Sequence, residues 1–77
     1  MAFDEAYFEI YPSPANDFVK LSVYSRHPSV LRIYNVMGML VEEIEVNSKE
    51  MEIDVSDYDT GVYFFNIEGQ ISKLIRK

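Results

Sequence analysis

Apolar and polar residues alternate along much of this chain with the two-residue period of a β-strand. In Phe18–Tyr24, the apolar residues Val19, Leu21 and Val23 fall on one face, and the polar residues between them fall on the other. Glu50–Val55 repeats this pattern, with apolar residues opposite carboxylates. Such alternation predicts strands that bury one face, and no segment has the apolar period of an amphipathic helix.

The longest apolar segment, Leu31–Val41, is interrupted by Gly38. Its β-branched and aromatic residues predict a strand, a tight turn through residues 36–38, and a second strand that continues to Val46. Glycine suits this turn because it adopts positive φ without a steric penalty. The segment Val62–Glu68 is apolar on both faces, which predicts a strand at the centre of a sheet.

Turn-forming residues divide the chain into short strands. Pro12 and Pro14 end the first strand, because each lacks a backbone N–H and restricts its neighbours. The predicted strands are Tyr7–Tyr11, Phe18–Tyr24, Val30–Asn35, Met39–Val46, Glu50–Val55, Val62–Glu68 and Ile71–Arg76. We expect an all-β fold, an immunoglobulin-like antiparallel β-sandwich of about seven short strands.

A chain of 77 residues is long enough for one domain. We assign residues 7–77 to this domain and residues 1–6 to a linker or a segment added by cloning, because chain ends are usually poorly ordered. The chain has no cysteine, so no disulfide supports its small core and no thiolate is available as a nucleophile or metal ligand.

The net charge of −6 comes mainly from carboxylates between Glu42 and Asp59, while Lys73, Arg76 and Lys77 form a small basic tail. Nucleic-acid binding requires a basic surface, so we expect no nucleic-acid partner. No apolar run approaches the roughly 20 residues of a membrane-spanning helix. The chain also begins without the pattern of a signal peptide, so export would require further sequence upstream or a signal of another kind.

Residues with catalytic or metal-binding chemistry are few and scattered. His27 is the single histidine and has no partner nearby in the sequence, so we expect an exposed loop residue. Asp54, Asp57 and Asp59 suggest calcium, but the spacing and the downstream glutamate of a calcium-binding loop are missing. Turn capping is the preferred role for these aspartates. We expect no enzyme activity, no cofactor and no metal.

The aromatic residues allow two interpretations. They could form a sugar-stacking platform, or they could fill the core, which is the commoner role in so small a domain. The residues concerned are Tyr7, Phe8, Tyr11, Tyr34, Tyr63, Phe64 and Phe65. A carbohydrate-binding or adhesive β-sandwich module appended to a surface enzyme therefore stays as an alternative function.

Four short motifs follow one another along the chain. They are Tyr-Pro-Ser-Pro-Ala at residues 11–15, Leu-x-Ile-Tyr-x-x-x-Gly-x-x-Val at 31–41, Gly-Val-Tyr-x-x-x-Ile at 61–67 and Lys-Leu-Ile-x-Lys at 73–77. Each motif alone is weak, but in this order the chain resembles the type A C-terminal sorting domain of the type IX (Por) secretion system of Bacteroidetes. Ser13 departs from the family pattern, which prefers asparagine, and serine can form a similar turn.

The resemblance implies a sorting signal that is not an enzyme. Such a domain follows an N-terminal cargo domain of the same precursor, passes through the periplasm and is recognised by the outer-membrane translocon. A sortase-like signal peptidase then removes it at or before residues 1–7, and the cargo reaches the cell surface or the medium. Our hypothesis is that a recognition motif is formed from residues of these four motifs, namely Pro12, Pro14, Gly38, Gly61, Tyr63, Lys73, Leu74, Ile75 and Lys77.

The last predicted strand, Ile71–Arg76, places Lys73 and Lys77 on one face of the chain end. The translocon could bind this edge, with addition of a strand, or the lysines could simply protect an exposed edge from aggregation. The two interpretations stay open. An exposed edge also allows two copies to pair, so a homodimer through this edge strand is a further expectation.

Overall fold

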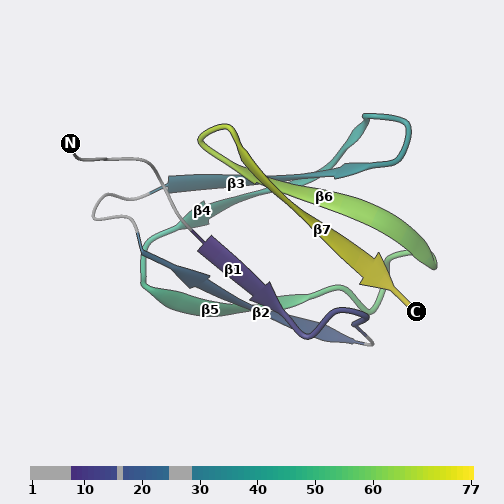
Figure 1. The fold of residues 1–77 in the computed structure, drawn as a ribbon, viewed down its shortest axis with the longest axis horizontal. Helices are drawn as coiled ribbons and strands as arrows, with labels where there is room; N and C mark the ends of the chain where they lie inside the picture. Colours follow the sequence, from purple (N-terminus) through teal and green to yellow (C-terminus); the bar gives the residue numbers. More distant parts are fainter. Residues whose placement is uncertain (1–7, 16, 25–28) are drawn as a thin grey trace.

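The structure is a computed structural model that describes residues 8–15, 17–24 and 29–77. Within these residues every regular element is a strand (Figure 1): β1 (Phe8–Tyr11), β2 (Phe18–Val23), β3 (Ser29–Asn35), β4 (Leu40–Val46), β5 (Glu50–Asp54), β6 (Gly61–Ile67) and β7 (Gln70–Arg76). Each predicted strand end within the described residues lies within one residue of the observed end, and the predicted start at Tyr7 lies outside them. In the described part of the chain there is no helix long and apolar enough to cross a membrane.

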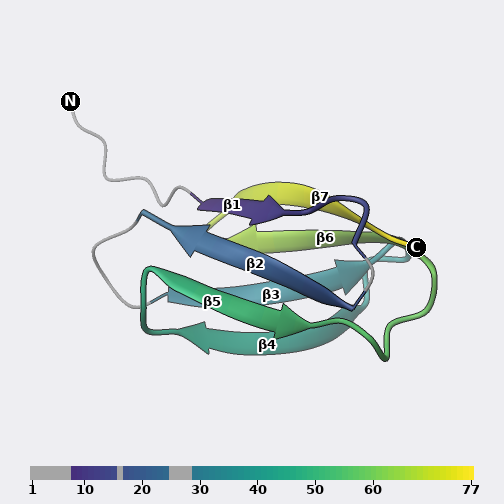
Figure 2. The ribbon, with the colours of Figure 1, turned by 90° about the horizontal axis from the view of Figure 1, so that it is seen from below.

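The strands form two antiparallel sheets that lie face to face as two layers (Figures 1 and 2). One sheet has three strands in the order β1-β2-β5, and the other has four strands in the order β4-β3-β6-β7. This strand order is that of an immunoglobulin-like sandwich, in which the chain crosses between the layers more than once. The predicted β-sandwich is therefore confirmed, as is the central position of β6 between β3 and β7.

The core lies between the sheets and is built from every second residue of most strands. Val19, Leu21 and Val23 of β2 point inward as predicted. The largest fully buried side chains are Phe65, Leu21, Leu31, Ile33, Ile67, Leu74, Val19 and Val55. Burial of each large apolar side chain contributes about 1.5–3 kcal/mol, so these positions carry most of the stability that a small domain can have.

A turn at residues 35–39 joins β3 to β4, and Asn35 organises it. The backbone N–H of Gly38 donates to the carbonyl of Asn35 at 3.0 Å. The side-chain oxygen of Asn35 accepts hydrogen bonds from the backbone N–H groups of Met37 and Met39 at 2.9 and 3.0 Å. Gly38 has a φ of +82°, which confirms the predicted turn glycine.

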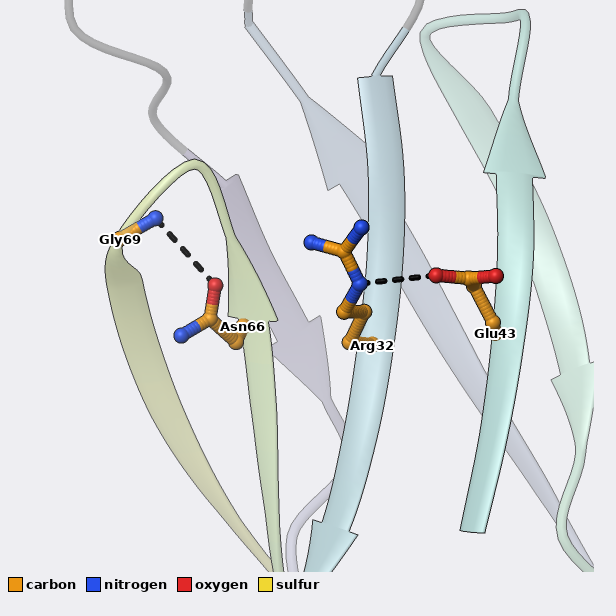
Figure 3. A network of polar contacts seen from close by, with 4 residues as sticks. All are labelled: Arg32, Glu43, Asn66 and Gly69. Carbon is orange, nitrogen blue, oxygen red and sulfur yellow. Dashed lines mark hydrogen bonds and ion pairs between the residues drawn. The ribbon is translucent and has the colours of Figure 1, made fainter. Parts of the chain in front are cut away.

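Glu68 and Gly69 form the two-residue turn between β6 and β7. Both have positive φ, +51° and +86°, as a type I′ turn requires. The side-chain oxygen of Asn66 accepts a hydrogen bond from the backbone N–H of Gly69 at 3.2 Å (Figure 3). This turn matches the twist of the two strands and sets the register in which Tyr63 lies opposite Leu74.

Candidate recognition surface

The last strand, β7, has one face in the core and one face in solvent. Leu74 is fully buried, whereas Ile71, Lys73 and Ile75 are exposed, Ile71 to 63%. The alternation predicted for this strand is therefore confirmed. Leu74 belongs to the proposed recognition motif, but a partner can reach only the outward residues while the fold is intact.

The inner face of β7 ends at Arg76, which joins the two sheets. Its Nε donates to the carbonyl of Val55 at 2.8 Å, and its Nη2 donates to the carbonyl of Ser56 at 3.0 Å. Both acceptors follow β5, a strand of the opposite sheet. The sequence shows Arg76 only as part of a basic tail, because its acceptors are backbone carbonyls, which leave no signal in the sequence.

Asp54 shapes the corner that provides these carbonyls. Its Oδ1 accepts hydrogen bonds from the hydroxyl of Ser56 at 2.6 Å and from the backbone N–H of Ser56 at 2.8 Å. The hydroxyl bond and then the backbone bond stabilise the carboxylate, so the pKa of Asp54 is lowered from its ordinary value. The turn-capping role predicted for this aspartate is confirmed.

Residues 12–15, which we call the proline segment, bind the end of β7. Ala15 is fully buried; its N–H donates to the carbonyl of Ile75 at 2.8 Å, and its carbonyl accepts from the N–H of Lys77 at 2.9 Å. The hydroxyl oxygen of Ser13 accepts from the N–H of Ile75 at 3.3 Å. The two prolines are exposed and have no N–H, so they act by shaping the segment so that its other residues reach the strand.

These bonds show which backbone N–H and C=O groups of β7 point away from its neighbouring strand β6. The N–H and C=O of Ile75 and the N–H of Lys77 point away from β6, toward the proline segment. Alternate residues of a strand present their backbone groups to the same side, so those of Ile71 and Lys73 also point away from β6. The hydrogen bonds of the proline segment are made to Ile75 and Lys77, near the end of this edge, and β1 also lies close to β7.

The Gly-Val-Tyr motif begins β6 and acts inside the fold. Tyr63 is 7% exposed, and its hydroxyl donates to the carbonyl of Asp59 at 2.7 Å. This contact is the tyrosine corner of immunoglobulin-like domains, in which a tyrosine near the start of a strand holds the preceding loop. Gly61, also in the motif, is half-buried and has a φ of +152°. Both residues support the loop and the strand start.

Tyr58 extends this support to β4. Its ring lies beside that of Tyr63, with centroids 5.0 Å apart, and its hydroxyl donates to Oε1 of Glu42 at 2.6 Å. Burial, followed by the hydrogen bond and the charge of Glu42, raises the pKa of the Tyr58 hydroxyl. The loop after β5 is thereby attached to β4 and β6, two strands of the opposite sheet.

The outer face of the four-stranded sheet combines an ion pair with apolar residues. Arg32 lies between Glu43 and Asn66 in the sheet register, and its Nε donates to Glu43 Oε2 at 2.8 Å (Figure 3). About half of each charged side chain is exposed, so the pair contributes about 0–1 kcal/mol. The next row across this face consists of Leu40, Tyr34, Phe64 and Lys73. Lys73 therefore ends a row of apolar and aromatic side chains.

The β3–β4 hairpin carries an exposed patch that we call the apolar hairpin tip. It consists of Val36, Met37, Met39, Leu40 and Val41, of which Met37 is 79% exposed. Figures 1 and 2 both place this hairpin at the same end of the long axis as the C-terminus. By their pattern alone, these residues predict only a turn and a strand. Five apolar residues around a turn glycine were the available signal, because turns are usually polar and exposed apolar patches mark interaction sites.

The remaining candidates divide into three groups. His27 lies outside the described residues. Among the residues that the structure describes, no group of three or more His, Cys, Asp or Glu side chains could hold a metal ion. Tyr7 also lies outside the described residues, and the other aromatics proposed for a platform are buried (Phe8, Tyr63, Phe65), half-buried (Tyr34, Phe64) or exposed (Tyr11).

Comparisons with known proteins agree with the motif order. The family model described as "Secretion system C-terminal sorting domain" matches residues 9–77. Beta-agarase A of Zobellia galactanivorans is 37% identical over 68 residues, which are 86% of this chain and 12% of that protein. Ulvan lyase NLR42 of Nonlabens ulvanivorans is 30% identical over 66 residues, which are 84% of this chain and 12% of that protein. No solved structure matches.

The match therefore covers a small part of much longer proteins and nearly all of this chain. The family is defined by a sorting role and has no catalytic assignment. Its members are attached to larger proteins that leave the cell or reach its surface. The chain belongs to the C-terminal sorting domains of the type IX secretion system of Bacteroidetes, which direct the proteins that carry them to secretion.

Proposed function

We propose that the outer-membrane translocon of the type IX system recognises the folded domain through two surfaces on the opposite edge strands of the four-stranded sheet, β7 and β4. One is the outward face of β7, with Ile71, Lys73, Ile75 and Lys77, and the other is the apolar hairpin tip. The observation that carries the proposal is the composition of β7: its outward face exposes two isoleucines on either side of a lysine, although a solvated strand face is usually polar.

The nine residues of the recognition motif then have two kinds of role. Leu74, Tyr63 and Gly61 act through the fold, because they are buried or half-buried. The residues that a partner can contact are exposed, and they are Pro12, Pro14, Gly38, Lys73, Ile75 and Lys77. On this proposal, a variant of the first group loses sorting only when it loses stability, whereas a variant of Lys73, Ile75 or Lys77 loses sorting with its fold unchanged. Pro12, Pro14 and Gly38 also shape their turns, so their variants do not separate the two roles.

Residues 1–6 form, in this proposal, the linker to an N-terminal cargo domain, since the family match begins at residue 9. The precursor crosses the periplasm, the translocon exports it, and a sortase-like signal peptidase cuts in or before residues 1–7. The cargo is then released or attached at the cell surface. Because the two relatives carry the names of polysaccharide-degrading enzymes, we propose an extracellular enzyme of this kind as the cargo.

A secretion assay tests the sorting role. Residues 2–77 are fused behind a fluorescent protein with an inner-membrane signal peptide and expressed in a bacterium with a type IX system and in a translocon-deficient strain. We expect fluorescence at the surface or in the medium of the competent strain alone. Retention in the periplasm of both strains, with the domain folded by circular dichroism, contradicts the proposal.

Point variants test the surface more sharply than truncation, because removal of residues 73–77 would also remove Leu74 and Arg76 from the fold. Lys73→Glu should reduce export of the reporter at unchanged thermal stability. Lys49→Glu is the matched control, because Lys49 is also an exposed lysine and lies between β4 and β5. Equal export of both variants would show that Lys73 only protects the edge.

The backbone groups of Ile71 and Lys73 point away from β6. We therefore also propose that a strand of the translocon, or of a second copy of the domain, pairs with this edge. N-methylation of the Ile71 amide in a semisynthetic domain removes one edge donor and leaves the side chains in place. Strand addition predicts weaker export of a ligated reporter precursor, and homodimerisation predicts a lower dimer fraction by analytical ultracentrifugation. If neither measurement changes, this edge is not used for pairing.

A further inference from the structure

The outer face of the three-stranded sheet differs in chemistry from the surface proposed for sorting. Alternation along β1, β2 and β5 directs two aromatic side chains and several polar ones away from the core. The outward residues are Glu9, Tyr11, Phe18, Lys20, Ser22, Glu50, Glu52 and Asp54. Tyr11 is 44% exposed and Phe18 is 51% exposed, so neither ring is needed to fill the core.

The sheet register brings these side chains together. Tyr11 lies opposite Lys20, and Lys20 lies opposite Glu52, so the three form one row across the sheet. Phe18 is two residues from Lys20 on the same face, which makes it a diagonal neighbour of Tyr11 at about 7–8 Å. The Tyr11 hydroxyl lies 3.4 Å from Oγ of Ser22, on the other side of Lys20.

A shallow depression lies within this face. It is lined by Tyr11, Lys20, Leu21, Glu50, Met51 and Glu52. Leu21 and Met51 point toward the core in the alternation of β2 and β5, so the side chains on the outer side of the depression are Tyr11, Lys20, Glu50 and Glu52, one aromatic ring among hydrogen-bonding groups. An aromatic ring beside such groups suits a ligand that has an apolar face and many hydroxyls. The ring can stack on the apolar face, and the polar groups can form hydrogen bonds with the hydroxyls.

The charge of this face limits the class of ligand that it can bind. The outward residues contain four carboxylates, Glu9, Glu50, Glu52 and Asp54, and a single cation, Lys20. This excess of negative charge repels sulfated or uronic-acid polymers, nucleic acids and anionic lipids. The hydroxyls of an uncharged sugar, in contrast, can donate hydrogen bonds to carboxylates and accept one from the lysine.

We infer that the outer face of the three-stranded sheet binds an uncharged polysaccharide chain, with Tyr11 and Phe18 as stacking residues and Lys20, Glu50 and Glu52 as hydrogen-bonding residues. This binding function is additional to sorting and uses the opposite layer of the sandwich. It does not depend on the translocon or on Lys73.

Affinity electrophoresis of the full 77-residue chain tests the inference. Native gels contain hydroxyethylcellulose, laminarin or glucomannan as uncharged polymers, and κ-carrageenan or polygalacturonate as charged ones. We expect at least one uncharged polymer to retard the chain and neither charged polymer to do so. Absence of retardation by all three uncharged polymers, or retardation by the charged ones alone, overturns the inference.

Three variants locate the site on the chain. Tyr11→Ala and Phe18→Ala should each weaken binding to the retarding polymer about tenfold, because a stacking ring is a typical anchor of an interface. Tyr11→Phe keeps the ring and should keep most of the affinity, which separates stacking from the hydroxyl contact with Ser22. Ile71→Ala is the control on the other layer, and thermal unfolding confirms that each variant is folded. Equal loss in Ile71→Ala, or full affinity in Tyr11→Ala, contradicts this site.

Discussion

The two faces of β7 contain neighbouring residues of one motif but have opposite roles. Leu74 is fully buried opposite Tyr63, whereas Lys73 and Ile75 on either side of it are exposed. Arg76 continues the inner role by binding carbonyls of the other layer. The difference shows that a motif at a chain end can combine buried residues that stabilise the domain with exposed residues that stay accessible to a partner, because side chains alternate between the two faces of a strand.

The largest expected effect belongs to the inner face. Leu74→Ala should lower the free energy of unfolding by about 3 kcal/mol, because it leaves a cavity in a tightly packed core. Ile71→Ala, on the outer face of the same strand, should change it by about 0.5 kcal/mol or less. Urea unfolding followed by circular dichroism measures both, and similar losses in the two variants would break the distinction between the faces.

The next effect concerns the contact between the layers. Arg76→Ala removes two hydrogen bonds to the carbonyls of Val55 and Ser56, and we expect a loss of about 2 kcal/mol. Arg32→Ala removes an exposed ion pair and should cost about 0.5 kcal/mol. The same unfolding measurement compares the two arginines. A larger loss of unfolding free energy in Arg32→Ala than in Arg76→Ala would mean that the ion pair on the outer face stabilises the fold more than the contact between the sheets does.

Charge reversal on the outer face should separate stability from export. Lys73→Glu should change the free energy of unfolding by about 0.5 kcal/mol or less, because the side chain is exposed. The same variant should reduce export of the reporter described above, whereas Lys49→Glu should not. If Lys73→Glu destabilises the domain as much as Leu74→Ala does, its export defect says nothing about recognition.

The smallest expected effect is a change in the pKa of Asp54, at the corner after β5 whose carbonyls bind Arg76. Ser56→Ala removes the hydroxyl bond to Asp54, so the pKa of the Asp54 carboxyl should rise toward its ordinary value, as carboxyl NMR titration measures. Because folding lowers this pKa, the carboxylate stabilises the fold above the ordinary aspartate pKa, and this contribution is lost as pH falls through the lower, folded value. Ser48→Ala, whose hydroxyl donates to a backbone carbonyl, should leave the titration of Asp54 unchanged.

Much of the fold could be predicted because its signals are local. The alternation in Phe18–Tyr24 and the turn glycine at Gly38 each depend on residues a few positions apart, and both were confirmed. The site was less predictable. The Gly-Val-Tyr motif indicates that Tyr63 matters but not that it is buried with its hydroxyl bound to Asp59, because a sequence motif does not distinguish a buried tyrosine from an exposed one. The apolar hairpin tip has no signal that separates it clearly from a strand, because its residues also fit an ordinary strand.

By itself, the sequence determined the strands, the turns, the central position of β6 and the family, since these follow from short-range periodicity and from motif order. Only the tertiary structure decided that Ser13 and Ala15 bind the end of β7, from which they are separated by most of the chain. It also decided that Arg76 bonds to the opposite layer and that Tyr11 and Phe18 share one open face. The physical reason is that hydrogen bonds to backbone groups and the pairing of distant strands depend on chain packing, which leaves no local pattern in the residues concerned.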